Sequence, residues 1–160
     1  GVMMQLRIVD RLADPETGDV QYRRPTAKRR CLRPGIARQI IAAMKTVTRE
    51  GGTAGKAAVP GYEVAGKTGT AEKFVNGTYD SGKHVASFVG FVPADNPAFV
   101  LLVSADEPSK KSYYGGTVAG PTFRRIAERS LRYLQVAPRT SPAPRTEPAA
   151  PEYVASRTAE

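Results

Sequence analysis

The segment Gly61–Thr70, with the sequence GYEVAGKTGT, contains residues that suit two different chemistries. The pattern G-x-x-x-x-G-K-[ST], in which a lysine and backbone N–H groups bind nucleotide phosphates, is matched by Gly61, Gly66, Lys67 and Thr68. The run Lys67–Thr70 also forms a K-T-G triplet followed by a second threonine, which is typical of serine acyl-transfer enzymes. The neighbouring elements must decide between the two interpretations.

A phosphate loop leaves a buried strand and opens directly into a helix, because free N–H groups and the helix dipole converge on the phosphates. One feature favours it: the apolar run FVLLVSADE ends in Asp106-Glu107, like a strand that carries a magnesium-binding acid. The segments on both sides of the motif do not fit this interpretation. GGTAGKAAVP is no buried strand, and too few residues separate Thr70 from the Asn76-Gly77 turn for a helix of useful length. Nucleotide binding is therefore the less favoured alternative.

Acyl transfer needs a nucleophile, a base, donors for the oxyanion and a group that holds the substrate carboxylate. An accessible strand ending in Lys67–Thr70 supplies the last two. Lys67 brings a positive charge, and the hydroxyls of Thr68 and Thr70 offer hydrogen bonds to a carboxylate. Gly69 has no side chain to keep a substrate backbone away, and the Thr70 N–H is a donor for the oxyanion. An edge strand with an exposed lysine is the purely structural alternative.

The elements around the motif are predicted to be strands. The segment Tyr62–Thr70 carries β-branched residues and glycines rather than helix formers, which predicts a strand that reaches the site at Lys67–Thr70. The polar residues 76–83 begin with an Asn-Gly turn signal and are expected to form a loop. Two apolar runs follow, His84–Val92 and Phe99–Ala105, and the short connection between them predicts an antiparallel pair.

Two amphipathic helices are predicted to cover these strands. From Pro34 to Val47, apolar residues recur at helical spacing, and Gly51-Gly52 terminates the pattern. The second helix begins near Pro121, and its apolar face comprises Phe123, Ile126, Ala127, Leu131 and Leu134. We expect this face to pack across the sheet. The predicted fold class is therefore α+β, an antiparallel sheet covered by helices.

The two ends of the chain have different character. Met3–Val9 and Val20–Tyr22 indicate a hairpin around the turn sequence DPETGD. Residues 136–160 are rich in Pro, Ala, Ser and Thr and lack apolar periodicity, which leaves too little burial to offset chain entropy. We expect a disordered tail over 136–160 and one folded unit over 1–135.

Composition restricts the possible partners. The formal net charge of +9 attracts anionic polymers without specificity. The densest basic run, Arg23–Arg33, has only Tyr22 nearby as a ring for base stacking, so a solvated surface is the simpler interpretation and no nucleic acid is expected. Cys31 and His84 are the only cysteine and histidine, so we expect no internal disulfide, no Cys/His metal site and no cofactor.

Three segments carry a resemblance to a known family: VPGYEVAGKTGTAEKF, ASFVGFVPADNPAFVLLVSADEP and YYGGTVAGPTFRRIAERSLRYL. In this order they resemble the C-terminal part of the transpeptidase domain of class B penicillin-binding proteins, the cell-division type above all. The likeness runs from about residue 3 to residue 134. It implies a serine β-lactamase-like fold and a cleft for the D-alanyl-D-alanine end of a peptidoglycan stem peptide, which β-lactams mimic. It assigns substrate and oxyanion roles to Lys67, Thr68, Gly69 and Thr70, and the cleft rim to Tyr113, Tyr114, Gly115 and Gly116.

The family's chemistry also needs an S-x-x-K motif, whose serine is acylated, and an S-x-N element. Neither occurs in the 160 residues. Since both motifs precede the triplet in the family, we expect an incomplete half of the transpeptidase domain that is poorly stable and inactive by itself. The resemblance implies an extracytoplasmic parent protein with an N-terminal membrane anchor, and partners among cell-division or elongation membrane proteins.

Two other functions stay open at this point. A basic, non-catalytic module for cell wall or nucleic acid would bind with strong salt dependence, and Lys67→Ala would leave that binding intact. A nucleotide-binding protein would show magnesium-dependent nucleotide affinity that Lys67→Ala abolishes.

Overall fold

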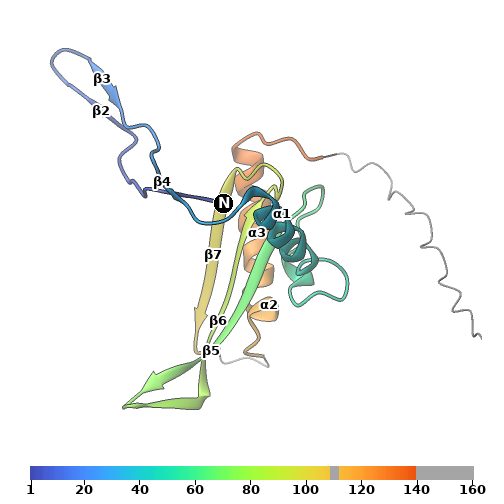
Figure 1. Cartoon of the computed structure of the whole chain (residues 1–160). Helices are drawn as coiled ribbons and strands as arrows, with labels where there is room; N and C mark the ends of the chain where they lie inside the picture. The colour runs from blue at the N-terminus through green and yellow to red at the C-terminus, as the bar shows by residue number, and fades with distance from the viewer. Residues whose placement is uncertain (109–111, 140–160) are drawn as a thin grey trace, which may run out of the picture.

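The computed structural model describes residues 1–108 and 112–139 and has an α+β fold. A three-stranded antiparallel sheet in the order β5-β6-β7 carries α3 along one face (Figure 1). The elements are β1 (Val2–Met4), β2 (Arg11–Ala13), β3 (Val20–Tyr22), β4 (Ala27–Arg30), α1 (Pro34–Thr46), η1 (Gly55–Ala57), β5 (Ala65–Val75), β6 (Thr78–Val92), β7 (Phe99–Asp106), α2 (Gly115–Val118) and α3 (Gly120–Tyr133). The predicted fold class is confirmed.

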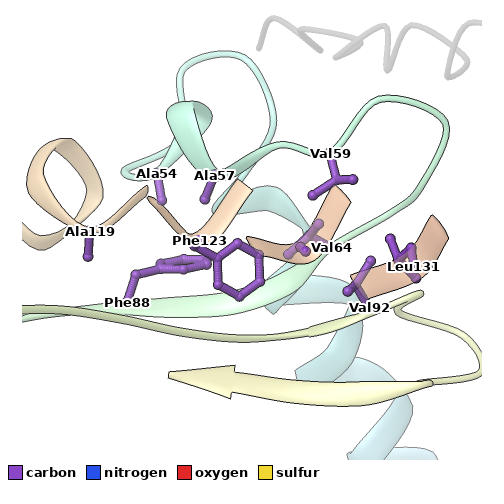
Figure 2. Packing of buried hydrophobic residues seen from close by; sticks show 10 residues of the cluster. Ala54, Ala57, Val59, Val64, Phe88, Val92, Ala119, Phe123 and Leu131 are labelled. Carbon is purple, nitrogen blue, oxygen red and sulfur yellow. The ribbon is translucent and has the colours of Figure 1, made fainter. Parts of the chain in front are cut away.

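The hydrophobic core lies between the sheet and α3. Figure 2 shows Phe88 of β6 facing Phe123 of α3, with ring centroids 4.8 Å apart in an edge-to-face arrangement. Val92 and Leu131 are fully buried beside them. Burial of each large side chain contributes about 1.5–3 kcal/mol, so these four residues fix α3 on the sheet.

Helix α3 confirms the predicted C-terminal helix but buries a narrower stripe. Phe123, Ala127 and Leu131, spaced by four residues, have no solvent exposure. Ile126 and Leu134 remain 40% and 51% exposed. A helix that contacts a three-stranded sheet through one row of side chains leaves the flanking apolar residues of the predicted face at the margin.

Helix α1 begins at the predicted Pro34, after Arg33, which makes no side-chain cap hydrogen bond. Met44 and Val47 are half-buried, and Val47 packs against the core. Ile36 and Ile40 are exposed, and no residue of α1 is buried. Only the C-terminal end of the predicted apolar stripe is therefore covered by described residues.

The hairpin formed by β5 and β6 is longer than the sequence indicates. The two-residue turn lies at Asn76 and Gly77, whose φ angles are 51° and 87°. Strand pairing continues to Val75 and resumes at Thr78, so the loop predicted over 76–83 is wrong at 78–80. Residues 81–83 belong to β6 but have no partner on β5, because the register shifts between Glu72 and Lys73. The distal half of the hairpin lies beyond the core, and Figure 1 shows it turned away from the sheet. Polar side chains do not interrupt pairing there because much of their surface lies in water.

The N-terminal arm, residues 1–33, consists of two small antiparallel pairs, β1 with β4 and β2 with β3. The predicted hairpin around DPETGD exists, but its first strand is Arg11–Ala13 and not Met3–Val9. Asp14 Oδ1 accepts the N–H groups of Glu16 and Thr17, which lowers the pKa of Asp14 and forms the turn. Figure 1 shows the arm projecting away from the sheet and helices.

The segment after α3 begins by folding back on the domain. Val136 packs against the core, and Arg139 donates its backbone N–H to the Gly61 carbonyl oxygen. These residues open the stretch expected to be a disordered tail; the rest of that stretch, 140–160, lies outside the described residues. Within the described part of the chain, no helix is long and apolar enough to cross a bilayer.

Candidate functional site

The motif Lys67–Thr70 lies on β5, which is an edge strand of the sheet. Its four residues pair with Val89, Phe88, Ser87 and Ala86 of β6 on one side only. Among residues 1–108 and 112–139, no strand pairs with the opposite edge of β5. An edge strand presents unpaired N–H and C=O groups to which an extended peptide can add.

Strand geometry divides the motif between two faces. Thr68 and Thr70 point to the face that carries α2 and α3, because Thr68 pairs with the buried Phe88. Lys67 alternates to the other face and is exposed. Its Nζ nevertheless lies 3.0 Å from the carbonyl oxygen and 3.4 Å from the Oγ1 of Thr68. The lysine charge and the first threonine hydroxyl therefore meet at the strand edge.

Gly69 makes room for a neighbour in the sheet. A Cβ at this position would lie 2.4 Å from the Ser87 Oγ. The missing side chain thus leaves room for the present rotamer of Ser87, a role separate from the substrate approach expected from the sequence. A larger residue at position 69 would force the Ser87 hydroxyl into another rotamer.

The sequence-predicted rim, residues 113–116, comes close to the motif. Gly115, the first residue of α2, donates its N–H to Thr70 Oγ1 at 3.2 Å. Tyr113 and Tyr114 are exposed, with ring centroids 4.6 Å apart, and the hydrogen bond from Tyr113 to Tyr114 raises the pKa of Tyr113. The structure thus brings the two predicted groups together through Thr70.

His84 belongs to the same region but carries no sequence signal. Its ring stacks on Tyr113, with centroids 4.3 Å apart and an interplanar angle of 18°. The two residues come from different elements and are separated by strand β7, so no local spacing connects them. Only the fold reveals that His84 supports the predicted rim.

A charged cluster at the start of β5 was also missed. Lys45 of α1 lies 2.7 Å from a Glu63 carboxylate oxygen and 2.5 Å from one of Asp95. Burial opposes the charge of Lys45, but the two carboxylates outweigh it and raise the Lys45 pKa. The same hydrogen bonds lower the pKa of Glu63 and Asp95. Arg49 and Arg139 complete the cluster, which joins α1, the β5 entry and the β6–β7 connection.

The geometry excludes a phosphate loop over Gly61–Thr68. Gly61 has φ of 81° in a tight turn in which Val59 and Tyr62 form an isolated bridge. Strand β5 begins at Ala65, three residues later than predicted, and runs through Gly66, Lys67 and Thr68. No helix opens at the lysine, so the convergent N–H groups that bind phosphate are absent from this segment. The described residues also contain no cluster of three potential metal ligands.

Comparison with known proteins agrees with this arrangement. Residues 1–128 match the family model "Penicillin binding protein transpeptidase domain". The chain is 48% identical over 110 residues, 69% of its length, to "Probable peptidoglycan D,D-transpeptidase PenA" of Neisseria gonorrhoeae. It is 42% identical over 127 residues, 79% of its length, to "Stage V sporulation protein D" of Bacillus subtilis. The matched regions cover only 19% and 20% of those two relatives.

Solved structures show the same relationship in three dimensions. The apo transpeptidase domain of penicillin-binding protein 3 from Burkholderia pseudomallei is 44% identical, with a TM-score of 0.65 over 75% of this chain and 36% of that one. Penicillin-binding protein 3 from Mycobacterium tuberculosis, complexed with ampicillin, gives a TM-score of 0.75 at 28% identity over 90% of this chain and 34% of that one. The family match, the sequence identity and the fold agree. This chain therefore belongs to the family of penicillin-binding protein transpeptidase domains and forms part of such a domain.

Proposed function

We propose that this chain provides the substrate-binding and oxyanion strand of a peptidoglycan D,D-transpeptidase. The observation that carries the proposal is the position of Lys67–Thr70 on an edge strand, with the Thr68 and Thr70 hydroxyls on one face. The gonococcal relative is described as a probable peptidoglycan D,D-transpeptidase, and the mycobacterial structure is complexed with ampicillin. Both support a stem peptide ending in D-alanyl-D-alanine as substrate, and β-lactams as its mimics.

Three residues of the motif, Lys67, Thr68 and Thr70, contact the substrate in this proposal, and Gly69 lets its backbone come close. The Thr68 and Thr70 hydroxyls donate to the terminal carboxylate of the peptide, and Lys67 attracts its charge. The Thr70 N–H donates to the oxyanion that forms when a serine oxygen attacks the carbonyl carbon of the penultimate D-alanine. The terminal D-alanine then leaves, and an amine of a second stem peptide takes the acyl group and releases the serine. Tyr113–Gly116 form the rim of the site.

The attacking serine is proposed to come from polypeptide outside these 160 residues. No serine in the sequence has a lysine three positions later, and no S-x-N element is present. We therefore propose that the chain is inactive by itself. As in other class B penicillin-binding proteins, the site would work outside the cytoplasmic membrane, tethered by an N-terminal anchor of the parent protein, among membrane proteins of division or elongation.

A chimera tests the proposal. The matching segment of the gonococcal relative is replaced by residues of this chain, and acylation is followed with a fluorescent penicillin. The chimera should be labelled and the isolated chain should not. Thr70→Val and Lys67→Ala in the chimera should each slow labelling, by up to about a hundredfold where an oxyanion or carboxylate contact is lost.

Two results would contradict the proposal. Labelling of the isolated 160 residues would show that the nucleophile lies within them. A chimera that melts cooperatively yet is labelled equally with and without Lys67 and Thr70 would show that the strand does not act on the ligand. Salt-dependent binding of cell-wall polymer or nucleic acid to the isolated chain, unchanged by Lys67→Ala, would instead support a basic binding module.

A further inference from the structure

Two aromatic side chains on the distal part of the β5–β6 hairpin lie outside the core. Phe74 and Tyr79 are directly paired across the hairpin, and their ring centroids are 5.2 Å apart in an edge-to-face arrangement. The two residues are 65% and 70% exposed, although burial of an aromatic ring is strongly favourable. The described part of the domain therefore gives this pair no packing role in the core.

The aromatic pair lies in the same row of side chains as the hydroxyls of the motif. Strand β5 runs without interruption over Ala65–Val75, so the even-numbered residues from Thr68 to Phe74 share one face. The side chain of Lys73 confirms that the alternation continues past the register shift. Its Nζ lies 3.0 Å from Asp106, which the strand pairing places on the opposite face of the sheet.

A substrate held by the motif runs toward this pair. In the proposed function, the terminal carboxylate lies near Lys67 and the reacting carbonyl lies at the Thr70 N–H. The rest of the stem peptide therefore continues past Thr70 toward Phe74, antiparallel to β5. The distance from Thr70 to Phe74 along an extended strand is about 13 Å. About three residues separate the penultimate D-alanine from the sugar that carries the stem, and an extended chain spans that separation in roughly 13 Å. The sugar thus arrives beside the aromatic pair.

The chemistry of the pair suits a sugar better than an apolar partner. One side of a pyranose ring presents C–H groups, which pack on the electron-rich face of an aromatic ring. A tyrosine hydroxyl also donates to and accepts from the hydroxyl and N-acetyl groups of the sugar. The residues around the pair include the polar Glu72, Asn76, Thr78 and Asp80. A protein interface or a membrane contact requires a larger apolar patch than two rings among polar side chains.

The base of the hairpin is fixed by ion pairs before any ligand binds. Lys73 Nζ lies 3.0 Å from a carboxylate oxygen of Asp106 and 2.7 Å from one of Glu107, at the C-terminal end of β7. Phe74 follows Lys73 directly, so these contacts restrict where its ring projects. A ring that is positioned in advance loses less conformational entropy when a ligand binds.

We propose that Phe74 and Tyr79 form a glycan subsite, which binds the N-acetylated sugar that carries the stem peptide. The proposal rests on the proposed function for the direction in which the stem peptide runs. The sugar contact itself involves neither the motif residues nor the rim, so the two proposals can be tested separately.

The first experiment measures sugar binding to the 160-residue chain by proton NMR. One probe is the glycan disaccharide carrying a tripeptide stem, and the other is the same tripeptide alone; neither has the D-alanyl-D-alanine end. The disaccharide probe should shift the ring protons of Phe74 and Tyr79 in a saturable way. Phe74→Ala should weaken this binding about five- to tenfold. Tyr133→Ala is the matched control, because Tyr133 is 87% exposed on α3 and should leave the affinity unchanged.

Equal ring shifts with both probes, or no shift with either, overturn the glycan subsite. An equal loss of affinity in Tyr133→Ala also overturns it, because the sugar would then bind exposed rings without preference. Vesicles of phosphatidylglycerol that shift both rings, when the disaccharide probe does not, would assign the pair to a membrane surface and overturn it as well.

The second experiment uses the chimera with the gonococcal relative. Release of D-alanine gives kcat/KM for the free pentapeptide and for the disaccharide pentapeptide. The chimera should favour the sugar-bearing substrate about tenfold, and the double substitution of Phe74 and Tyr79 by alanine should abolish this preference. The rate with the free pentapeptide should stay within about twofold, because that substrate does not reach the rings. Tyr79→Phe keeps the ring and should retain most of the preference.

A chimera without this preference, or with a preference that survives loss of both rings, overturns the glycan subsite. Penicillin labelling that depends on Lys67 and Thr70 would leave the proposed function standing in that case. The opposite combination separates the two proposals in the other direction. Saturable, sugar-dependent ring shifts in the 160-residue chain, together with a folded chimera that penicillin does not label, would support the sugar contact and remove the proposed function alone.

Discussion

The Tyr62 hydroxyl donates a 2.6 Å hydrogen bond to the carbonyl oxygen of Val136, 74 residues later in the chain. Tyr62 stands three residues before β5, so the contact ties the segment after α3 to the approach of the motif strand. Next to it, Arg139 binds the Gly61 carbonyl oxygen through its N–H and pairs with Asp95 through its guanidinium group. The residues just after α3 therefore help to hold the strand in place.

Removal of residues 136–160 should destabilise the chain more than removal of 140–160. The longer deletion removes the partner of Tyr62, which contributes about 1 kcal/mol, together with the apolar contact of Val136. Thermal melting of both truncated chains measures the difference. Equal melting temperatures would show that residues 136–139 add no stability and that the folded unit ends at residue 135, as the composition of the chain suggests.

Tyr62→Phe supplies a finer test of the same contact. Loss of the hydroxyl should lower the free energy of unfolding by about 1 kcal/mol in the full chain and by almost nothing in the chain that ends at residue 135. Chemical denaturation of the four proteins completes this cycle. A full effect of the substitution in the shorter chain would show that Tyr62 acts through another partner.

Lys45→Met should destabilise the chain at neutral pH and much less in acid. The methionine keeps the apolar stem but loses two charge-assisted hydrogen bonds, whose loss costs about 1–2 kcal/mol after solvent screening of the half-exposed carboxylates. The pKa values of Glu63 and Asp95 are lowered in the folded state, so their contribution is present above the ordinary values of 4.5 and 3.8. It is lost as pH falls through the folded pKa values.

At high pH, the contribution of these ion pairs to stability is limited by the titration of Lys45 itself. Its pKa is raised above the ordinary 10.5, so its contribution is complete below that pH and is lost as pH rises through the folded value. Urea denaturation of the wild type and of Lys45→Met, repeated from acid pH to above pH 10.5, measures the difference between their free energies of unfolding. If the difference in unfolding free energy stays constant from acid to neutral pH, packing and not charge explains the destabilisation by Lys45→Met.

Phe123→Ala should be among the most damaging substitutions in the domain. Phe123 is fully buried and meets Phe88 edge-to-face, so a cavity and a lost aromatic pair together cost about 3–5 kcal/mol. Ile126→Ala on the same helix is the control, because 40% exposure limits its cost to about 1 kcal/mol. Similar costs for the two would show that α3 does not pack on the sheet through this face.

Gly77→Ala should loosen the distal hairpin without affecting the core. Gly77 has φ of 87°, where an alanine costs about 1 kcal/mol, and nothing packs on it. Amide exchange of Phe74 and Tyr79, whose rings meet across the hairpin, should accelerate while that of Phe88 stays constant. Gly35→Ala in α1 is the control, since its φ is not left-handed and its surroundings are open. Uniform acceleration in every strand would mean that the hairpin is part of the cooperative core.

Much of this fold was predictable because its elements carry periodic apolar residues. Helix α3 shows the four-residue spacing of Phe123, Ala127 and Leu131, and β7 alternates half-buried and exposed residues as a strand on one core face does. Helix α2 was not predicted, because Gly115–Val118 has little helix propensity and forms through packing of its glycines on the sheet.

The motif strand was predictable because residues 66–70 contain β-branched threonines and no strong helix former except Lys67, and in an extended backbone Thr68 and Thr70 must share a face. The cluster around Lys45 was not, because it joins residues from three distant segments and no periodicity connects them. The stacking of His84 on Tyr113 was not predictable for the same reason, since the two residues come from distant segments. Contacts that depend on how elements meet leave no trace in local spacing.

The crowding at Gly115 and Gly116 limits how this region can diversify. A carbon atom added at either glycine would overlap backbone oxygen atoms, and these atoms cannot move unless the backbone around them shifts. Any residue larger than glycine is therefore disfavoured at both positions. Tyr113 and Tyr114, immediately before them, are exposed, and their rings contact each other and His84 and not backbone oxygens. An alanine at either glycine would therefore have to move α2 away from the sheet or from the Thr53–Ala54 backbone, which changes the distance between the rim and the motif strand.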